Sequence, residues 1–397
     1  MMMRSALGFL LCFGLHAADI KVISPAGATV VGPYSPGLLA GDFLYVSGQG
    51  AANAERKFAE TAEQQVLDTL KNIQNIVEAA GLTMEHIVYT QVYVKDPAAF
   101  AAVDKVWAKV FPKNSPARAV LGVYKMPTDT PVEINAVAVT DLARKQAVKV
   151  DGWPANAQAP AAVIAGDRIF ISGITGQGAD PESQVQQALG RFQQILKAAG
   201  ADLPHVVFVN PYLTDKMPMN IMNRIYAKHF EFGNTPARAT IRVSSLPDDA
   251  GIEFTGVAVR DLSKRRAVRP KNMDPSPTAS PCVFANDTLY CSAKSGFIPG
   301  PQSGIYATSV EHQVRQTMRN LLDGLEEAGL DFSTVVASNV YLDNLEEFTR
   351  MNGVYGQYFT KVKPTRTTLQ PLPSVERKTD EQGRNVKLEE ISVIAVR

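Results

Sequence analysis

Three arginines recur along the chain, each just after a proline in a short turn. The three segments are SPARAV, TPARAT and KPTRTT, which carry Arg118, Arg238 and Arg366. A planar guanidinium can hold a carboxylate through two parallel hydrogen bonds, so arginine suits an organic-acid ligand. The repeated arginine therefore predicts a recurrent site for small carboxylates.

Two further polar residues accompany each arginine. The glutamates Glu133, Glu253 and Glu390 begin the last strand-like segment of each copy, and the serines Ser47, Ser172 and Ser292 end the first hairpin-like segment. The first copy alone adds Tyr34, within GPYSPG. A carboxylate near a bound acid can orient or deprotonate a water molecule, so the set predicts attack by water. Exposed ion pairs, worth under about 1 kcal/mol, are the alternative interpretation of the Arg and Glu residues.

Other catalytic patterns are missing from the sequence. None of the five histidines forms a short-spaced metal-ligand pair with another His or Cys. There is no phosphate-binding glycine-rich loop and no GxSxG elbow. The net charge of +1 does not favour a nucleic-acid partner. We therefore expect no cofactor, no metal and no nucleic acid.

Residues 1–18 have the pattern of a secretory signal. Arg4 precedes the apolar run at residues 6–15, and the small residues Ala17 and Ala18 follow it. This run is too short to anchor the chain in a bilayer, and a buried N-terminal helix is the alternative. We expect removal of the signal, export to the periplasm or beyond, and no membrane association.

An internal repeat distributes the polar residues over three units. The hairpin LLAGDFLYVSG returns as VIAGDRIFISG and VFANDTLYCSA, each with a Gly-Asp or Asn-Asp pair suited to a tight turn. A helix with one apolar face follows each hairpin and ends at EAAG, KAAG or EEAG. We expect units at residues 19–142, 143–262 and 263–397.

Each unit is predicted to be a hairpin, helix, strand, helix and hairpin, an α+β pattern. Two helices cover one face of a sheet, yet Val137 and Val139 stand beside Ile134 and Ala138, so both faces are apolar. Exposing several hundred Å² of apolar sheet would cost several kcal/mol, at about 25 cal/mol per Å². We therefore expect an intramolecular pseudo-trimer with sheets inside and helices outside, and a chain that is monomeric.

Two cysteines flank the hairpin of the third unit. If Asn286 and Asp287 form a two-residue turn, Cys282 and Cys291 face each other as a non-hydrogen-bonded pair. This pairing is compatible with a cross-strand disulfide, which export would permit. Two unbridged core cysteines are the alternative.

Several motifs, taken in order, are similar to the RidA/YjgF family of reactive-intermediate deaminases. They are GPYSPG, the hairpin ending in SGQ, EAAGL, VYVKD, PAR and VEINAVAV. The resemblance covers residues 32–141 and, more weakly, the other two units. It implies a chorismate-mutase-like fold, which family members assemble into homotrimers with ligand clefts between subunits. This chain resembles such a trimer joined into one polypeptide.

The resemblance also implies an activity, the hydrolysis of small 2-imino carboxylates to 2-oxo acids and ammonia. By position, the arginines would hold the substrate carboxylate and the glutamates would position water. We expect the best site in the first unit, with Arg118, Glu133, Tyr34 and Ser47 as catalytic residues. The expected binding residues of the other units are Arg238, Glu253, Ser172, Asn223, Arg366, Glu390, Ser292 and Asn352.

The units differ from the family pattern and from one another. Asn223 and Asn352 match an asparagine common in the family clefts, whereas the first unit has Asp104. Alanines stand near the place of Tyr34 in the second and third units. A non-catalytic binder of small carboxylates is therefore the main alternative function. An endoribonuclease and a holdase, roles also attached to the family, are weaker alternatives.

Overall fold

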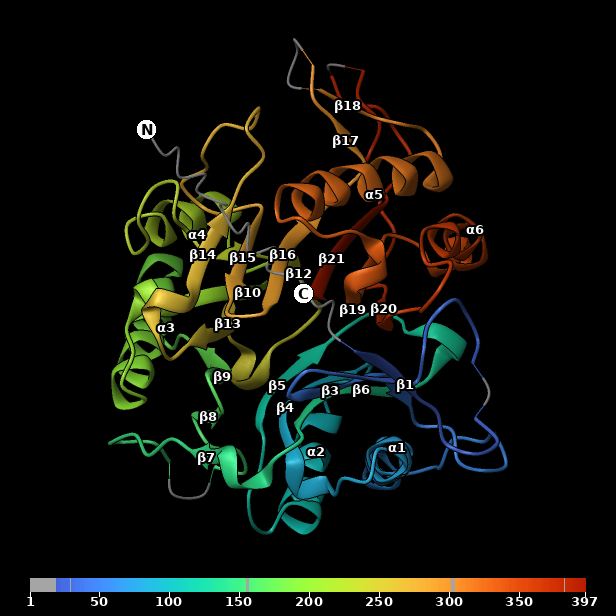
Figure 1. Cartoon of the computed structure of the whole chain (residues 1–397), viewed down its shortest axis with the longest axis vertical. Coiled ribbons are helices and arrows are strands. Elements are labelled where there is room, and N and C mark those ends of the chain that lie inside the picture. Colours follow the sequence, from blue (N-terminus) through green and yellow to red (C-terminus); the bar gives the residue numbers. More distant parts are fainter. Residues whose placement is uncertain (1–18, 29, 155–156, 301–303, 382) are drawn as a thin grey trace, which may run out of the picture.

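The computed structural model describes residues 19–28, 30–154, 157–300, 304–381 and 383–397, so the expected signal at residues 1–18 lies outside it. Each unit forms one large sheet with two helices on one face. In Figure 1 the first unit is blue to teal, the second green to yellow, and the third orange to red.

The first unit contains six strands and the helices α1 (Ala62–Ala79) and α2 (Ala99–Val110). Its strands are β1 (Ile20–Ile23), β2 (Gly37–Ala40), β3 (Phe43–Gly50), β4 (Ile87–Val94), β5 (Ala117–Gly122) and β6 (Val132–Val139).

The second unit contains seven strands and the helices α3 (Pro181–Ala198) and α4 (Met219–Tyr226). Its strands are β7 (Lys145–Ala147), β8 (Ala162–Ala165), β9 (Arg168–Thr175), β10 (Val206–Leu213), β11 (Ala237–Arg238), β12 (Ile241–Arg242) and β13 (Ile252–Val259).

The third unit contains the helices α5 (Val310–Glu327) and α6 (Phe348–Tyr355), a six-stranded sheet and a two-stranded ribbon. Its strands are β14 (Arg265–Val268), β15 (Cys282–Ala285), β16 (Thr288–Lys294), β17 (Phe297–Ile298), β18 (Ile305–Tyr306), β19 (Val335–Leu342), β20 (Thr365–Leu369) and β21 (Glu389–Val396). Strands β17 and β18 form the ribbon.

The predicted hairpins and helices form where the sequence places them. Residues Gly41, Gly166 and Asn286 adopt positive φ at the tight turns between paired strands. Each long helix is followed by a glycine at φ +77°, namely Gly81, Gly200 and Gly329. The apolar residues on one face of α1, Val66, Leu70, Ile73 and Val77, are all buried, so this helix packs against its sheet through that face.

The predicted last hairpin is wrong, because its two strands do not pair with each other. In the first unit the order is β1-β2-β3-β6-β4-β5, so β6 lies between β3 and β4. The arginine strand β5 follows the crossover helix α2 and pairs in parallel with β4. It therefore occupies the sheet edge, as do β11 and β20 in the other units.

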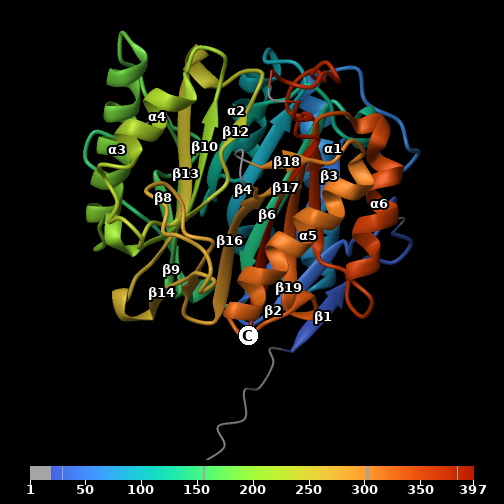
Figure 2. The same cartoon turned by 90° about the horizontal axis from the view of Figure 1, so that it is seen from above.

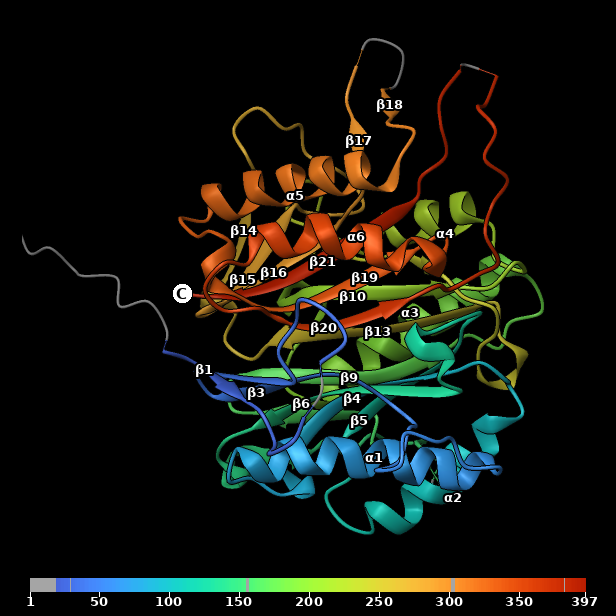
Figure 3. The same cartoon turned by 90° about the vertical axis from the view of Figure 1, so that its right-hand side faces the viewer.

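The three sheets share one apolar core on the faces that their own helices leave uncovered. This core takes buried residues from every unit, among them Tyr45, Phe170 and Tyr290. Figure 2 shows α3 and α4 on one side and α5 and α6 on the other, with the strands between them. In Figure 3 helices α1 and α2 cover the opposite end from α5 and α6. The edge strands complete a cycle, because β5 lies beside β9, β11 beside β16, and β20 beside β3.

Among the described residues, no helix combines the length and the apolar character needed to cross a bilayer.

Candidate functional site at the seams between units

Each arginine lies where the edge strand of one unit meets the next unit. The backbone N–H groups of Arg118, Arg238 and Arg366 donate hydrogen bonds of 3.0, 2.8 and 2.9 Å to the hydroxyls of Ser172, Ser292 and Ser47. Each hydroxyl in turn donates to a backbone carbonyl of its own unit at 2.6 Å. We name the three places the Arg118, Arg238 and Arg366 seams.

The expected catalytic set in the first unit is divided between two seams. Tyr34, Ser47 and Glu133 lie at the Arg366 seam, and Arg118 lies at the seam with the second unit. The physical reason is the topology: β4 separates the arginine strand β5 from β6, which carries Glu133, and the free edge of β5 meets the neighbouring unit through the Arg118 backbone. Each site therefore combines an arginine from one unit with a serine and a glutamate from the next.

The Arg366 guanidinium is buried, and no described residue forms a hydrogen bond with either of its terminal nitrogens. The residue is 4% exposed, and its Nη1 and Nη2 atoms lack hydrogen-bond partners among the described residues. Three aromatic rings surround it, with centres 5.0, 5.3 and 5.4 Å from Cζ, belonging to Tyr355, Tyr34 and Phe348. Burial lowers the pKa of Arg366. An anionic ligand would supply the missing hydrogen bonds to this cation.

Two neutral polar groups near this arginine are also unsatisfied. The Asn352 Oδ1 and Thr368 Oγ1 atoms are buried and have no hydrogen-bond partner among the described residues. A side-chain carbon added to Gly32 would come within 2.8 Å of Arg366 Nη2 and 3.3 Å of Asn352 Nδ2. Gly32 therefore keeps the space beside both groups open. Buried polar atoms usually have partners, so this group is typical of a ligand site.

Glu133 supplies a buried carboxyl at the same seam. It is 5% exposed and lies so close to Gly48 that a side-chain carbon on this glycine would overlap it. Burial raises the pKa of Glu133 to about 8, against the lowering effect of the Arg366 charge. Such a carboxyl can exchange protons near neutral pH, which a general base or acid requires.

The Arg118 seam holds a similar glutamate, but its arginine is already ion-paired within its own unit. Burial raises the pKa of Glu253 to about 8, and the charge of Arg118 opposes that shift. Arg118 Nη2, however, is ion-paired with the carboxylate of Asp104 on α2. The backbone bonds at Ser47 and Ser172 align Ala159 with Tyr34, so this seam also lacks the tyrosine. The arginine here already has an internal carboxylate.

The Arg238 seam has an available arginine but a different glutamate. Arg238 Nη1 donates to Asn223 Oδ1 at 2.8 Å, and its Cζ lies 5.2 Å from the centre of the Tyr226 ring. Glu390 Oε2 lies 2.6 Å from Lys387 Nζ. The first and second units have a glycine after the serine, whereas the third unit has Ala293.

Sequence reasoning missed the aromatic residue beneath each arginine. Trp107, Tyr226 and Tyr355 lie 4.9 to 5.2 Å from the guanidinium carbons. Each stands three residues after Asp104, Asn223 or Asn352 on the second helix of its unit. This fixed spacing is a signal that comparison of the repeats could have detected.

A cavity of about 80 Å³ between the three sheets was also missed. Amide side chains from all three units line it, namely Gln91, Asn135, Asn210 and Asn339. Gln91, Asn210 and Asn339 occupy matching places on β4, β10 and β19, where an amide side chain interrupts a mainly apolar strand. That interruption is the sequence signal for the cavity.

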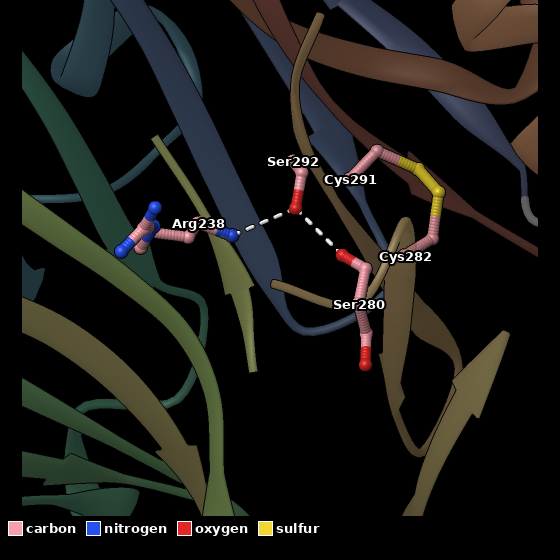
Figure 4. Close-up of a disulfide and its surroundings, with 5 residues drawn as sticks. All are labelled: Arg238, Ser280, Cys282, Cys291 and Ser292. Atoms are coloured by element: carbon pink, nitrogen blue, oxygen red, sulfur yellow. Dashed lines mark hydrogen bonds between the residues drawn. A yellow bond between two sulfur atoms is a disulfide. The ribbon is translucent and has the colours of Figure 1, made fainter. Parts of the chain in front are cut away.

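The proposed cysteine pair is confirmed. Cys282 and Cys291 form a disulfide, and their Cα atoms face each other across β15 and β16. Figure 4 shows the disulfide beside the Ser280 and Ser292 groups that hold the Arg238 backbone.

Comparison with known proteins supports the repeat. The protein-family model described as Endoribonuclease L-PSP matches residues 26–140, 154–260 and 271–377. A RutC family protein of Saccharolobus solfataricus is 36% identical over 110 residues, covering 27% of this chain and 87% of that protein. A RutC family protein of Aquifex aeolicus is 36% identical over 122 residues, covering 30% and 98%.

Solved structures similar to this chain include two of different extent. The YjgF gene product of E. coli is 35% identical and covers 30% of this chain and 99% of its own, with a TM-score of 0.29. A chorismatase covers 79% of this chain and 93% of its own at 12% identity, with a TM-score of 0.54. The second comparison shows a shared fold.

Proposed function

The chain belongs to the RidA family, described as Endoribonuclease L-PSP, in three tandem units, and we propose that it hydrolyses small 2-imino carboxylates at the Arg366 seam. One observation carries the proposal: a buried guanidinium without a partner faces the ionisable carboxyl of Glu133 across two units. No other seam combines these features among the described residues. The resemblance to reactive-intermediate deaminases supplies the substrate class.

The site residues would divide the reaction as follows. Arg366 binds the substrate carboxylate and thereby fixes the adjacent C=N carbon, while the rings of Tyr34 and Tyr355 limit its position. Glu133 accepts a proton from water as the water oxygen bonds to that carbon. The C=N bond becomes a C–N single bond, and the nitrogen takes up the proton. The new hydroxyl group then gives its proton to the nitrogen, with Glu133 as the relay, as its oxygen forms the C=O bond. Breakage of the C–N bond releases ammonia and leaves the 2-oxo acid.

This reaction needs only positioning and proton transfer. Holding the reactants together can supply several kcal/mol of the barrier, and a positioned base typically adds a factor of about 10²–10⁴. The imine and water together contain every atom of the products.

A binder of small carboxylates is the second candidate, and the state of Glu133 favours it. Because burial raises the pKa of Glu133 to about 8, most of this carboxyl is protonated at neutral pH. A protonated carboxyl donates a hydrogen bond to a ligand but is a weak base.

We also propose export, with residues 1–18 as the signal. The disulfide between Cys282 and Cys291 supports an oxidising compartment, where such bonds persist. Free-thiol titration of the unfolded secreted protein should then detect no thiol from this pair.

A competition assay tests the proposed activity. An amino-acid oxidase generates 2-iminopropanoate, and semicarbazide traps it. The parent protein should reduce the yield of semicarbazone, and Glu133→Gln should lose this effect while still binding pyruvate in equilibrium dialysis. If the parent protein binds pyruvate without competing for the imine, the binder replaces the hydrolase.

A further inference from the structure

The Arg238 seam keeps the scaffold of the other two. Ser292 accepts a hydrogen bond from the Arg238 amide and donates one to the Ser280 carbonyl, as Figure 4 shows. Tyr226 lies under Arg238 as Tyr355 lies under Arg366. An anion that reaches Arg238 would therefore meet a guanidinium held in the same way.

The neighbours of Arg238 leave it open to an anion. Its partner Asn223 is neutral, whereas Arg118 is paired with the Asp104 carboxylate. Thr240 follows Arg238 by two residues, and its hydroxyl is buried without a hydrogen-bond partner among the described residues. Thr368 repeats this feature at the Arg366 seam, but the Arg118 seam has Val120. Asparagine and an unpartnered threonine thus occur together at the two seams whose arginine has no internal carboxylate.

The glutamate distinguishes the Arg238 seam from the Arg366 seam. Glu133 and Glu253 lie against Gly48 and Gly173, where an added side-chain carbon would overlap their carboxyl groups. The third unit has Ala293 at this position, so its methyl group occupies that space. Glu390 is paired instead with Lys387, at 2.6 Å. The group that would hold the attacking water is therefore committed elsewhere.

We propose that the Arg238 seam is a second site for a small monocarboxylate and that it binds this ligand without hydrolysing it. The guanidinium would hold the carboxylate, and the Thr240 hydroxyl offers a donor to a carbonyl at the adjacent carbon. A 2-oxo acid has both groups. The inference rests on the proposed function for the ligand class alone, and it predicts two bound carboxylates per chain.

Equilibrium dialysis with radiolabelled 2-oxobutanoate measures that number. The parent chain should bind two molecules at saturation. Asn223→Asp and Asn352→Asp should each bind one, and the double variant none, because the new carboxylate pairs with the arginine as Asp104 does naturally. Any other number for the parent chain, or two ligands in Asn223→Asp, overturns the inference.

The Asn352→Asp variant also separates binding from hydrolysis. It should retain one 2-oxobutanoate while losing imine hydrolysis at least tenfold; hydrolysis at the parent rate would overturn the assignment of the Arg238 seam as non-hydrolytic. If Asn223→Asp does not fold, Arg238→Met replaces it and should likewise bind one ligand. A parent chain that binds two ligands but hydrolyses no imine contradicts the proposed function and leaves this inference standing.

Discussion

The Arg366 and Arg118 seams share a backbone scaffold but differ in the source of the carboxylate that pairs with the arginine. At the Arg118 seam it is a side chain of the protein, and at the Arg366 seam it would be a ligand. At both seams an edge-strand arginine bonds to a serine of the next unit, and a buried glutamate has a pKa raised to about 8. At the Arg118 seam Asp104 neutralises the arginine, whereas at the Arg366 seam Asn352 cannot. One charged oxygen in place of an amide nitrogen thus neutralises the arginine, although the serine and the buried glutamate of the site are kept.

A residue type that recurs in each unit does not create the same site in each unit. Asp104 is 56% exposed and its ion pair contributes little to stability, about 0–1 kcal/mol. The same carboxylate would repel a bound organic acid, because like charges about 4 Å apart near a protein surface cost about 4 kcal/mol. Its effect on binding is therefore larger than its effect on folding.

Removal of each arginine should give the largest difference in activity between the two seams. Arg366→Met should lower kcat/KM for 2-iminopropanoate by about 10²–10³-fold, because the carboxylate loses its charged hydrogen-bond donors. Arg118→Met should change kcat/KM less than about twofold, since Asp104 already occupies that guanidinium. The competition assay measures both values, and equal losses would contradict the division between the seams.

The pH dependence of kcat/KM should show whether Glu133 acts as a base at the Arg366 seam. Burial raises the pKa of Glu133 to about 8, so its basic form is scarce at pH 6 and half populated at pH 8. We expect kcat/KM to rise about fiftyfold between these values and to level off above pH 9. Glu133→Gln should give a low and flat profile. A parent profile that falls with pH would show that Glu133 acts as an acid instead.

Opening the Arg118 seam should make it resemble the Arg366 seam. Asp104→Asn removes the internal carboxylate and copies Asn352. We expect a gain of one site for 2-oxobutanoate, with affinity at this seam improved by up to about 10³-fold, the factor to which about 4 kcal/mol corresponds. Asp68→Asn on α1, where Asp68 accepts a hydrogen bond from Gln64 of the same helix, is the matched control, and its binding should equal that of the parent. An unchanged number of ligands in Asp104→Asn would show that the missing tyrosine closes this seam.

The smallest effect concerns the space beside Arg366. Gly32→Ala would place a methyl carbon 2.8 Å from Arg366 Nη2, so one of the two must shift. We expect KM to rise about threefold to tenfold and the thermal midpoint to stay within about 2 °C. Ala159→Gly, near the corresponding place of the Arg118 seam, should leave KM unchanged. A parent-like KM in Gly32→Ala would mean that the ligand does not enter beside Nη2.

The repeat, the helices, the turns and the disulfide could be predicted because they depend on local patterns. The apolar stripe from Val66 to Val77 has helical spacing, and Gly81 fits the left-handed conformation that ends the helix. The pairing of Cys282 with Cys291 follows from a two-residue turn within one hairpin. Such features need only residues that are close in sequence.

The amino-acid sequence was enough to identify the residues that can bind a carboxylate or transfer a proton. They are the three arginines with their glutamates and serines, and Tyr34. Only the tertiary structure decided their grouping, because β6 enters between β3 and β4 and leaves β5 at the edge. An edge strand must find its neighbour in another unit, so Arg366 joins Glu133 although they are far apart in the chain. The spacing of residues within one repeat cannot reveal this grouping, because the contacts between units depend on how the three sheets pack together.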